Sequence, residues 1–324
     1  MKKIVLTLAA VLLVAASLTG CAAAKVYKLG TGSFTEASSR AAVTGTDGRV
    51  QFTTEYATVL VDKAGKIVYV NLDSAQNSGT FGTTGLIVKA EVAPTKKEKG
   101  AAYNMKDKSP IKKEWFEQIA ALETYFTGKT IDEILAMKLT KGVSEDLKTS
   151  VTITITPFQE AVKKAVASAV EVKGLKSVGS ASVSDMKSSN FVVGKDGSVQ
   201  ANVVFAGVAL DKDGKVLYVA IDTAQNSGTF NALGAIVKAE VAPTKKEKGA
   251  AYNMKAASLI KKEWFEQIAA LEKYFIGKTS AEITAIPLTK DVPTVEDLKT
   301  SVTVKITSYQ AVVKKAITNA IVIK

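Results

Sequence analysis

Polar and apolar residues alternate along two neighbouring stretches of the chain near residue 60, as they do in a β-hairpin. Residues 51–60 alternate weakly and end in a β-prone run, and residues 67–72 return as a second apolar stretch. The segment between them, residues 62–66, predicts a turn in which Gly65 is free to adopt a positive φ. The polar stretch 76–81 then predicts a loop after the hairpin.

After a short predicted strand at residues 89–93, apolar residues recur with the spacing of an amphipathic helix. Ser109 with Pro110 predicts the first turn of a helix, and Gly128 predicts its end. Apolar side chains recur every three or four residues between these signals and predict one buried helical face: Ile111, Trp115, Ile119, Leu122 and Phe126.

Two further segments complete the pattern. Thr130 and Glu133 have the spacing of a capping box, which predicts a short helix to Met137. Residues 150–155 alternate Thr with Val or Ile and predict a strand that returns to the sheet, and Thr156-Pro157 predicts the start of a closing helix. The expected fold class is α+β, with an antiparallel sheet (the hairpin plus the returning strand) packed by two or three helices.

The whole pattern occurs twice, because residues 59–166 return as residues 208–317. Each copy is long enough to bury a core of its own, so the sequence predicts two tandem domains, residues 25–173 and 174–324. The Gly-, Ser- and Lys-rich stretch 174–190 is either a linker or the first strand of the second domain. Three blocks are identical between the copies: residues 75–81 and 224–230, 87–106 and 236–255, and 111–123 and 260–272.

The N-terminal segment has the features of a leader. Two lysines precede an apolar run, residues 4–18, which is typical of a secretory signal peptide and too short for a permanent transmembrane helix. The run ends in Leu18-Thr19-Gly20-Cys21, which resembles the bacterial lipobox, in which the cysteine is diacylated after cleavage. We therefore expect a signal peptide at residues 1–20, lipidation of Cys21, a tether at residues 21–24, and an extracytoplasmic protein anchored to the cell membrane.

Composition narrows the chemistry. The chain contains no histidine, and Cys21 is its one cysteine, which removes histidine-based catalysis and makes a transition-metal site implausible. We therefore expect no catalytic residues, no metal and no enzyme activity. The formal net charge is +12, yet Arg40 and Arg49 are the only arginines, which disfavours nucleic acid as a partner. A lysine-rich surface favours contact with lipid headgroups, an anionic wall polymer or an acidic partner, and is equally compatible with a solvated surface.

A polar and basic block present in both copies supplies the candidate ligand-binding residues. Amide and hydroxyl groups can hydrogen-bond a small ligand, lysines attract an anion, and a tyrosine can stack on a ring. A solvated loop explains the same residues, so their convergence on one concave surface is the discriminating observation. The candidates are Gln76, Asn77, Ser78, Lys96, Lys97 and Tyr103 in the first copy, and Gln225, Asn226, Ser227, Lys245, Lys246 and Tyr252 in the second.

The order of elements resembles the FMN-binding domain family of bacterial extracytoplasmic flavoproteins. Residues 59–70 are similar to that family's Gly-Lys hairpin, and residues 146–166 to its closing segment, where a Ser-Gly-Ala-Thr motif carries the flavinylated threonine. That motif is absent here. The resemblance implies FMN as the cofactor, and it implies Thr156 and Thr307 as the positions nearest to the family's attachment site. Residues 111–128, with their Trp-Phe-Glu-Gln core, also resemble tandem-domain lipoproteins of clostridial type.

Two functions remain open on the sequence alone. The first is an extracytoplasmic lipoprotein that binds a small anionic ligand such as flavin and serves electron transfer, with a redox protein as its partner. The second is a structural or adhesive module of the cell surface, in contact with wall polymer or membrane, that binds no small molecule.

Overall fold

The computed structural model describes residues 26–323. The predicted signal peptide, the lipidation site at Cys21 and the tether therefore lie outside the described residues. Within the described part of the chain, no helix is both long and apolar enough to cross a membrane.

The first copy forms a five-stranded antiparallel sheet in the order β4-β3-β2-β1-β7, with helices on one face. The sheet and its antiparallel pairing confirm the predicted α+β class. Its elements are β1 (Tyr27–Arg40), β2 (Gly48–Val61), β3 (Ile67–Phe81), β4 (Ile87–Glu91), α1 (Lys96–Lys99), the 3₁₀ helix η1 (Gly100–Tyr103), α2 (Trp115–Phe126), α3 (Ile131–Leu135), β5 (Leu139–Thr140), β6 (Val143–Ser144), α4 (Thr156–Ala167) and β7 (Val170–Val172).

The second copy repeats this arrangement in a sheet of order β11-β10-β9-β8-β14. Its elements are β8 (Ser177–Ser189), β9 (Gly197–Leu210), β10 (Val216–Phe230), β11 (Ile236–Glu240), α5 (Lys245–Lys248), η2 (Gly249–Tyr252), α6 (Trp264–Phe275), α7 (Ser280–Thr284), β12 (Leu288–Thr289), β13 (Val292–Pro293), α8 (Glu296–Lys299), α9 (Thr307–Thr318) and β14 (Ile321–Val322). The stretch 174–190, which the sequence left open, is therefore mostly strand β8.

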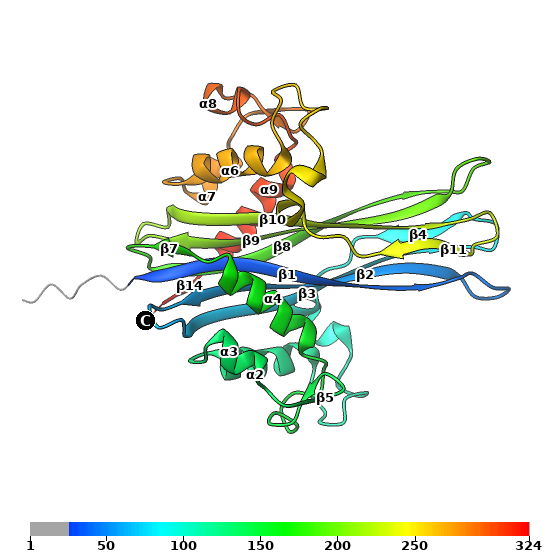
Figure 1. The fold of residues 1–324 in the computed structure, drawn as a ribbon, viewed down its shortest axis with the longest axis horizontal. Coiled ribbons are helices and arrows are strands. Elements are labelled where there is room, and N and C mark those ends of the chain that lie inside the picture. The colour runs from blue at the N-terminus through cyan, green and yellow to red at the C-terminus, as the bar shows by residue number, and fades with distance from the viewer. Residues whose placement is uncertain (1–25, 324) are drawn as a thin grey trace, which may run out of the picture.

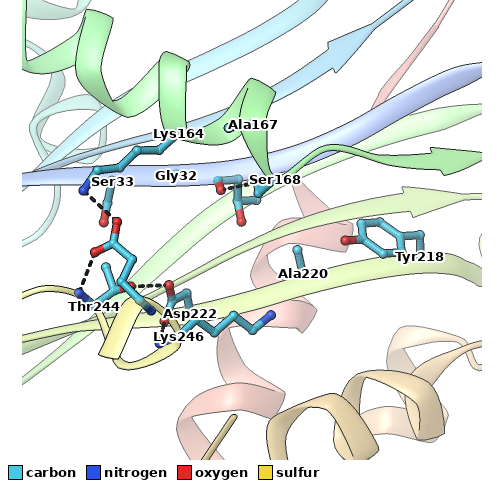
Figure 2. Close-up of a pocket in the computed structure, with 12 residues that line it drawn as sticks. Gly32, Ser33, Lys164, Ala167, Ser168, Tyr218, Ala220, Asp222, Thr244 and Lys246 are labelled. Carbon is cyan, nitrogen blue, oxygen red and sulfur yellow. Dashed lines mark hydrogen bonds and ion pairs between the residues drawn. The ribbon is translucent and has the colours of Figure 1, made fainter. Parts of the chain in front are cut away.

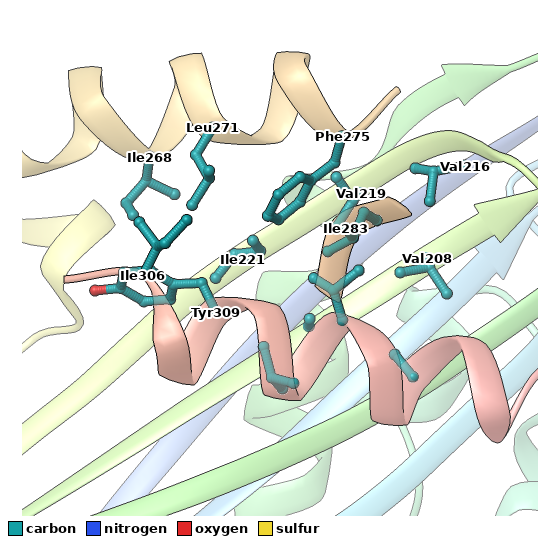
Figure 3. Packing of buried hydrophobic residues seen from close by; sticks show 14 of the residues in the cluster. Val208, Val216, Val219, Ile221, Ile268, Leu271, Phe275, Ile283, Ile306 and Tyr309 are labelled. Carbon is teal, nitrogen blue, oxygen red and sulfur yellow. The ribbon is translucent and has the colours of Figure 1, made fainter. Parts of the chain in front are cut away.

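Each sheet buries one face beneath its own helices. In the second copy, Ile268 and Leu271 of α6 pack over Ile221 of β10, while α7 and α9 close the same cluster (Figure 3). The helix α4 comes so close to β1 that a Cβ atom at Gly30 would collide with the carbonyl oxygen of Ala165, and Gly179 meets Ala316 in the same way. Glycine at this position lets helix and strand backbones touch.

The opposite faces of the two sheets pack on each other, which gives four layers in the order helices, sheet, sheet, helices (Figure 1). The rings of Phe81 and Phe230, at corresponding positions of the two copies, stack with centroids 3.8 Å apart and an interplanar angle of 4°. Both rings are completely buried, and Val50 and Val199 belong to the same mixed cluster. The two copies therefore share a core in addition to the core that each has beneath its helices.

Reciprocal contacts join the copies, as expected for two similar units related by an approximate two-fold axis. The amide of Ala42 donates to the carbonyl oxygen of Gly234 (2.9 Å), and the amide of Phe191 donates to that of Gly85 (2.8 Å). Lys164 of α4 pairs with Glu247 of the second copy at 2.7 Å, and Lys315 of α9 pairs with Glu98 of the first.

Several local predictions were wrong, and each error has a physical cause. Residues 76–81 continue strand β3 instead of forming a loop. Their polar side chains alternate between the face that meets the other sheet and a half-exposed region of the opposite face, so a strand can accommodate them. The helix α2 begins at Trp115 and not at Pro110, because Lys112 adopts a φ of 53°, which is incompatible with a right-handed helix at this residue. Residues 150–155 form no strand, because their buried apolar side chains pack under the helices; the returning strand is β7.

Other local predictions are confirmed. The turn after Asp62 is held by its Oδ1 atom, which accepts from the amides of Ala64 and Lys66 at 2.9 Å each, and Gly65 has a φ of 76°. The capping box at Thr130 is present with both of its hydrogen bonds. Thr156-Pro157 does begin the closing helix α4, but the expected cap is wrong, because the N-cap is Ile155 and Thr156 is the first helical residue.

Candidate functional site

The candidate residues of strands β3 and β10 separate to two faces, because neighbouring side chains of a strand point in opposite directions. Gln76 and Ser78 lie on the face that carries the helices, and Asn77 lies on the face that meets the other sheet. Gln225, Ser227 and Asn226 divide in the same way on β10. The side chain of Asn77 donates to Ser184 Oγ of the second sheet (3.0 Å) and accepts from the amide of Ala93 (3.3 Å).

Asn77 and Asn226 are thus structural residues. Both are buried, and Asn226 Oδ1 accepts from the amide of Ala242 at 2.8 Å. Each amide side chain fixes the segment that leads into the following short helix, so neither is free to bind a ligand.

Lys97 and Lys246 are structural as well. Lys97 Nζ donates to Glu123 Oε1 (2.5 Å), and the same oxygen accepts from the amide of Leu72 in β3 (2.6 Å). Lys246 and Glu272 repeat this pair at 2.6 Å. The Glu123 carboxylate therefore accepts the backbone N–H of Leu72, which no neighbouring strand pairs, and the ammonium group of Lys97 compensates the charge of that carboxylate.

Three of the remaining candidates, Gln225, Lys245 and Tyr252, meet in the second copy, whereas Ser227 does not belong to this group. With Lys187 and Lys248, which the sequence did not single out, they form what we call the lysine–tyrosine site. Lys245 Nζ lies 4.9 Å from the ring centroid of Tyr252 and 5.4 Å from that of Trp264. Lys248 Nζ lies 5.8 Å from the Tyr252 ring, whose hydroxyl donates to Gln225 Oε1 (3.1 Å). Strands β9 and β10 extend beyond the helices that cover the rest of the sheet (Figure 1).

Positive charge is concentrated at this site. Burial and then the neighbouring Lys187 lower the pKa of Lys245 to about 8. Burial raises the pKa of Tyr252, while Lys248 and Lys187 oppose that rise. The carboxylates of Asp222 and Asp185 act on the pKa of Lys245 in the opposite direction, and Asn202 donates to Asp185 at 2.8 Å. An anion placed among the three lysines would relieve their mutual repulsion.

The corresponding place in the first copy has a different charge. Lys96 Nζ lies 5.4 Å from the ring centroids of both Tyr103 and Trp115. Ser38 occupies the position of Lys187, and the buried Glu55 occupies that of Val204. Burial raises the pKa of Glu55 to about 7, and the charge of Lys96 opposes this shift. The lysine and the tyrosine are therefore the same in both copies, but the sheet residues that they face differ between the copies.

Neither of the predicted flavin-attachment positions, Thr156 and Thr307, lies among side chains that would bind a phosphate. The hydroxyl of Thr307 donates to Asp291 Oδ1 (3.0 Å), and Lys305 pairs with the same carboxylate (3.1 Å). A phosphodiester on this hydroxyl would stand beside a negative charge. Thr156 is exposed at the start of α4 and offers only a helix N-terminus. Neither position fits a covalently held FMN.

Two clefts at corresponding positions between the copies were not anticipated from the sequence. The large cleft has a volume of about 540 Å³ and lies between β1 and α4 of the first copy and β10 and α5 of the second (Figure 2). The small cleft has a volume of about 230 Å³ and lies between β3 and α1 of the first copy and β8 and α9 of the second. The large cleft is lined by Ser33, Lys164, Tyr218, Asp222, Thr244 and Glu247, among others.

Comparison with known proteins assigns no family. No family model matches the chain, and no solved structure matches it. The chain is similar to a protein named chlorophenol reductase from Desulfitobacterium hafniense, with 58% identity over 40 residues. This segment is 12% of each protein, so the chain spans only a small part of that relative's length. Among the described residues, no cluster of three or more acidic, cysteine or histidine side chains is arranged to hold a metal ion.

Proposed function

We propose that the chain is an extracytoplasmic, lipid-anchored protein that binds a small anionic ligand at the lysine–tyrosine site of its second copy. The observation that carries this proposal is the convergence of Lys245 and Lys248 on the ring of Tyr252, with Lys187 close enough to lower the pKa of Lys245 and to oppose the rise in the pKa of Tyr252. Lys245 is half-buried and has no carboxylate within ion-pair distance among the described residues. A buried cation without a partner is costly, and a bound anion removes that cost.

FMN is the candidate ligand that the sequence resemblance names, and its phosphate suits three lysines. The uncovered sheet beside Tyr252 presents Gln225 and Gln200, which supply hydrogen-bonding groups for the remainder of such a ligand. Because neither Thr156 nor Thr307 fits a phosphodiester, the ligand is held non-covalently in this proposal.

The first prediction compares FMN with riboflavin, which carries the same ring system without the phosphate. We expect FMN to bind at least about tenfold more tightly, since a hydrogen bond to a charged group contributes about 1.5–3 kcal/mol. Lys245→Gln should remove this preference. Fluorescence quenching of the flavin on titration with the protein measures both affinities, and inorganic phosphate should compete with FMN.

Lys96→Gln is the matched control, because Lys96 is the same residue in the same local structure of the first copy. It should leave FMN binding within about twofold of the unchanged protein. Equal binding of FMN and riboflavin, or equal losses from Lys96→Gln and Lys245→Gln, would contradict the proposal.

A structural or adhesive module is the second candidate, and one observation favours it. Apolar side chains are exposed at the hairpin ends farthest from Tyr27, among them Val193 at 97% and Leu233 at 75% exposure (Figure 1). Such side chains are typical of a contact surface. The absence of any anion binding in the titration above would leave this candidate in place.

A further inference from the structure

The large and the small cleft are built from corresponding residues, yet they differ about twofold in volume. In the small cleft, Asn71 and Asn319 occupy the positions that Ala220 and Ser168 occupy in the large one. The larger side chains take up the space, and the cleft volume falls from about 540 to about 230 Å³. The sequence therefore narrows one cleft and leaves its counterpart wide.

The carboxylate at the base of each cleft shows the same difference. In the small cleft, Tyr56 donates its hydroxyl to Asp73 Oδ2 at 3.1 Å. In the large cleft, Asp222 replaces Asp73, but Phe205 stands in the place of Tyr56 and has no hydroxyl. Asp222 Oδ2 accepts from Thr244 Oγ1 (2.6 Å) and retains capacity for a second donor, because a carboxylate oxygen can accept two hydrogen bonds.

A second polar group of the large cleft lacks a partner. Ser33 lines the cleft and is 2% exposed, and its Oγ atom has no hydrogen-bond partner among the described residues. Its counterpart Ser182 is also buried, and its Oγ atom also lacks a partner among the described residues, but Ser182 does not line the small cleft. The difference is therefore that only Ser33 can be reached by a ligand in its cleft. A buried hydroxyl without a partner is costly, and a ligand in the cleft can satisfy it.

The two lysines of the large cleft are already paired, and its buried carboxylate is held by neutral donors. Lys164 pairs with Glu247 at 2.7 Å, and Lys246 pairs with Glu272 at 2.6 Å. Asp222 Oδ1 accepts from the amides of Thr223 (2.7 Å) and Lys246 (3.0 Å). An anionic ligand would find no free lysine among the described residues of this cleft, and the Asp222 carboxylate is already hydrogen-bonded by two amides and a hydroxyl. Ligand hydroxyl groups find acceptors and donors at both ends of the cleft, from Asp222 and Ser33 to Tyr218 (Figure 2).

We propose that the large cleft between the two copies binds an uncharged ligand rich in hydroxyl groups, of the size of a sugar ring. A ligand hydroxyl donates to Asp222 Oδ2, another bonds to Ser33 Oγ, and the Tyr218 side chain bounds the far end. The site is separate from the lysine–tyrosine site, so this inference does not depend on the binding of an anion there.

The test compares three ligands that share one ring: glucose, glucosamine with an ammonium group, and glucuronate with a carboxylate. Saturation-transfer NMR with the intact mature chain should show glucose binding in the millimolar range, and neither charged analogue should bind more tightly than glucose. A tetramer of N-acetylglucosamine, as a fragment of a wall glycan, distinguishes a polymer from a free sugar as the source, and a preference for either supports the proposal.

Variants locate the binding. Ala220→Asn copies the residue of the small cleft and should weaken glucose binding at least about tenfold, and Ser33→Ala should weaken it about three- to tenfold. Asn71→Ala, which alters the small cleft, should leave it unchanged, as should Lys245→Gln. A melting temperature equal to that of the parent verifies folding of each variant.

Three results would overturn the proposal: no binding of glucose or the tetramer at about 100 mM, tighter binding of a charged analogue, or unchanged affinity in both Ala220→Asn and Ser33→Ala.

Discussion

Replacing Phe81 by alanine should lower the free energy of unfolding of the whole chain by about 3–5 kcal/mol, the usual cost of deleting a buried phenylalanine side chain. The ring is fully buried against Phe230 at 3.8 Å, so the loss leaves a cavity between the two sheets. Because both copies contribute to this core, we expect one cooperative transition in urea, with its midpoint displaced and both copies unfolding together.

Phe116→Ala is a suitable control, because Phe116 is 37% exposed on α2 and should cost far less. Phe230→Ala should resemble Phe81→Ala, and the double variant should cost less than the sum of the two, since each ring is the other's partner. Two separate transitions, of which Phe81→Ala displaces only one, would show instead that the copies fold as independent domains.

The second large effect concerns the pH dependence of stability. Glu55 is 4% exposed, its Oε1 accepts from Ser74 at 3.3 Å, and its Oε2 has no partner among the described residues. Burial raises its pKa to about 7, against an ordinary value of 4.5. Between these values the folded chain retains a proton that the unfolded chain has released. The contribution of Glu55 to stability is therefore fully present below pH 4.5 and is lost as the pH rises through 7.

The expected loss is at most about 3 kcal/mol, because each unit of pKa shift corresponds to about 1.4 kcal/mol. Glu55→Val, which copies Val204 of the second copy, should remove this contribution and be the more stable protein at pH 8. Urea unfolding of both proteins at pH 4.5 and pH 8 measures the difference. Parallel stability curves for the two proteins would contradict the assignment.

Much of the fold could be predicted because local signals determine it. The turn at Asp62, the capping box at Thr130 and the antiparallel hairpin follow from residues close in sequence. Residues 76–81 could not be assigned to a strand from their polarity, because the partner of their inner face is the other sheet. Polar residues such as Asn77 are buried there by contacts with residues more than a hundred positions away in the sequence, for example Ser184.

The candidate site was predicted in part for the same reason. Gln225, Lys245 and Tyr252 do meet, whereas Lys246 and Asn226 serve the structure. The sequence could not reveal Lys187, which lies outside the identical block and joins the site only through the register of the sheet. Nor could it reveal the clefts, because each one combines elements from both copies.

The identity of the block at residues 87–106 and 236–255 now has a structural explanation. Lys97 and Lys246 compensate the carboxylates that cap the strand edges, and Glu98 and Glu247 form the reciprocal ion pairs between the copies. Both copies need these contacts, so the identity alone does not indicate two equal ligand sites. The divergence of Glu55 and Ser38 from Val204 and Lys187 supports ligand binding in the second copy only.

The pKa of Lys245 tests the proposed anion site most directly, and NMR of the lysine side chains can measure it with and without FMN. In the free protein we expect a pKa of about 8, lowered by burial and by Lys187. A bound anion should raise it towards the ordinary range, and FMN affinity should fall as the pH rises through 8 and the ammonium group loses its proton. An ordinary pKa for Lys245 that FMN leaves unchanged would contradict the account.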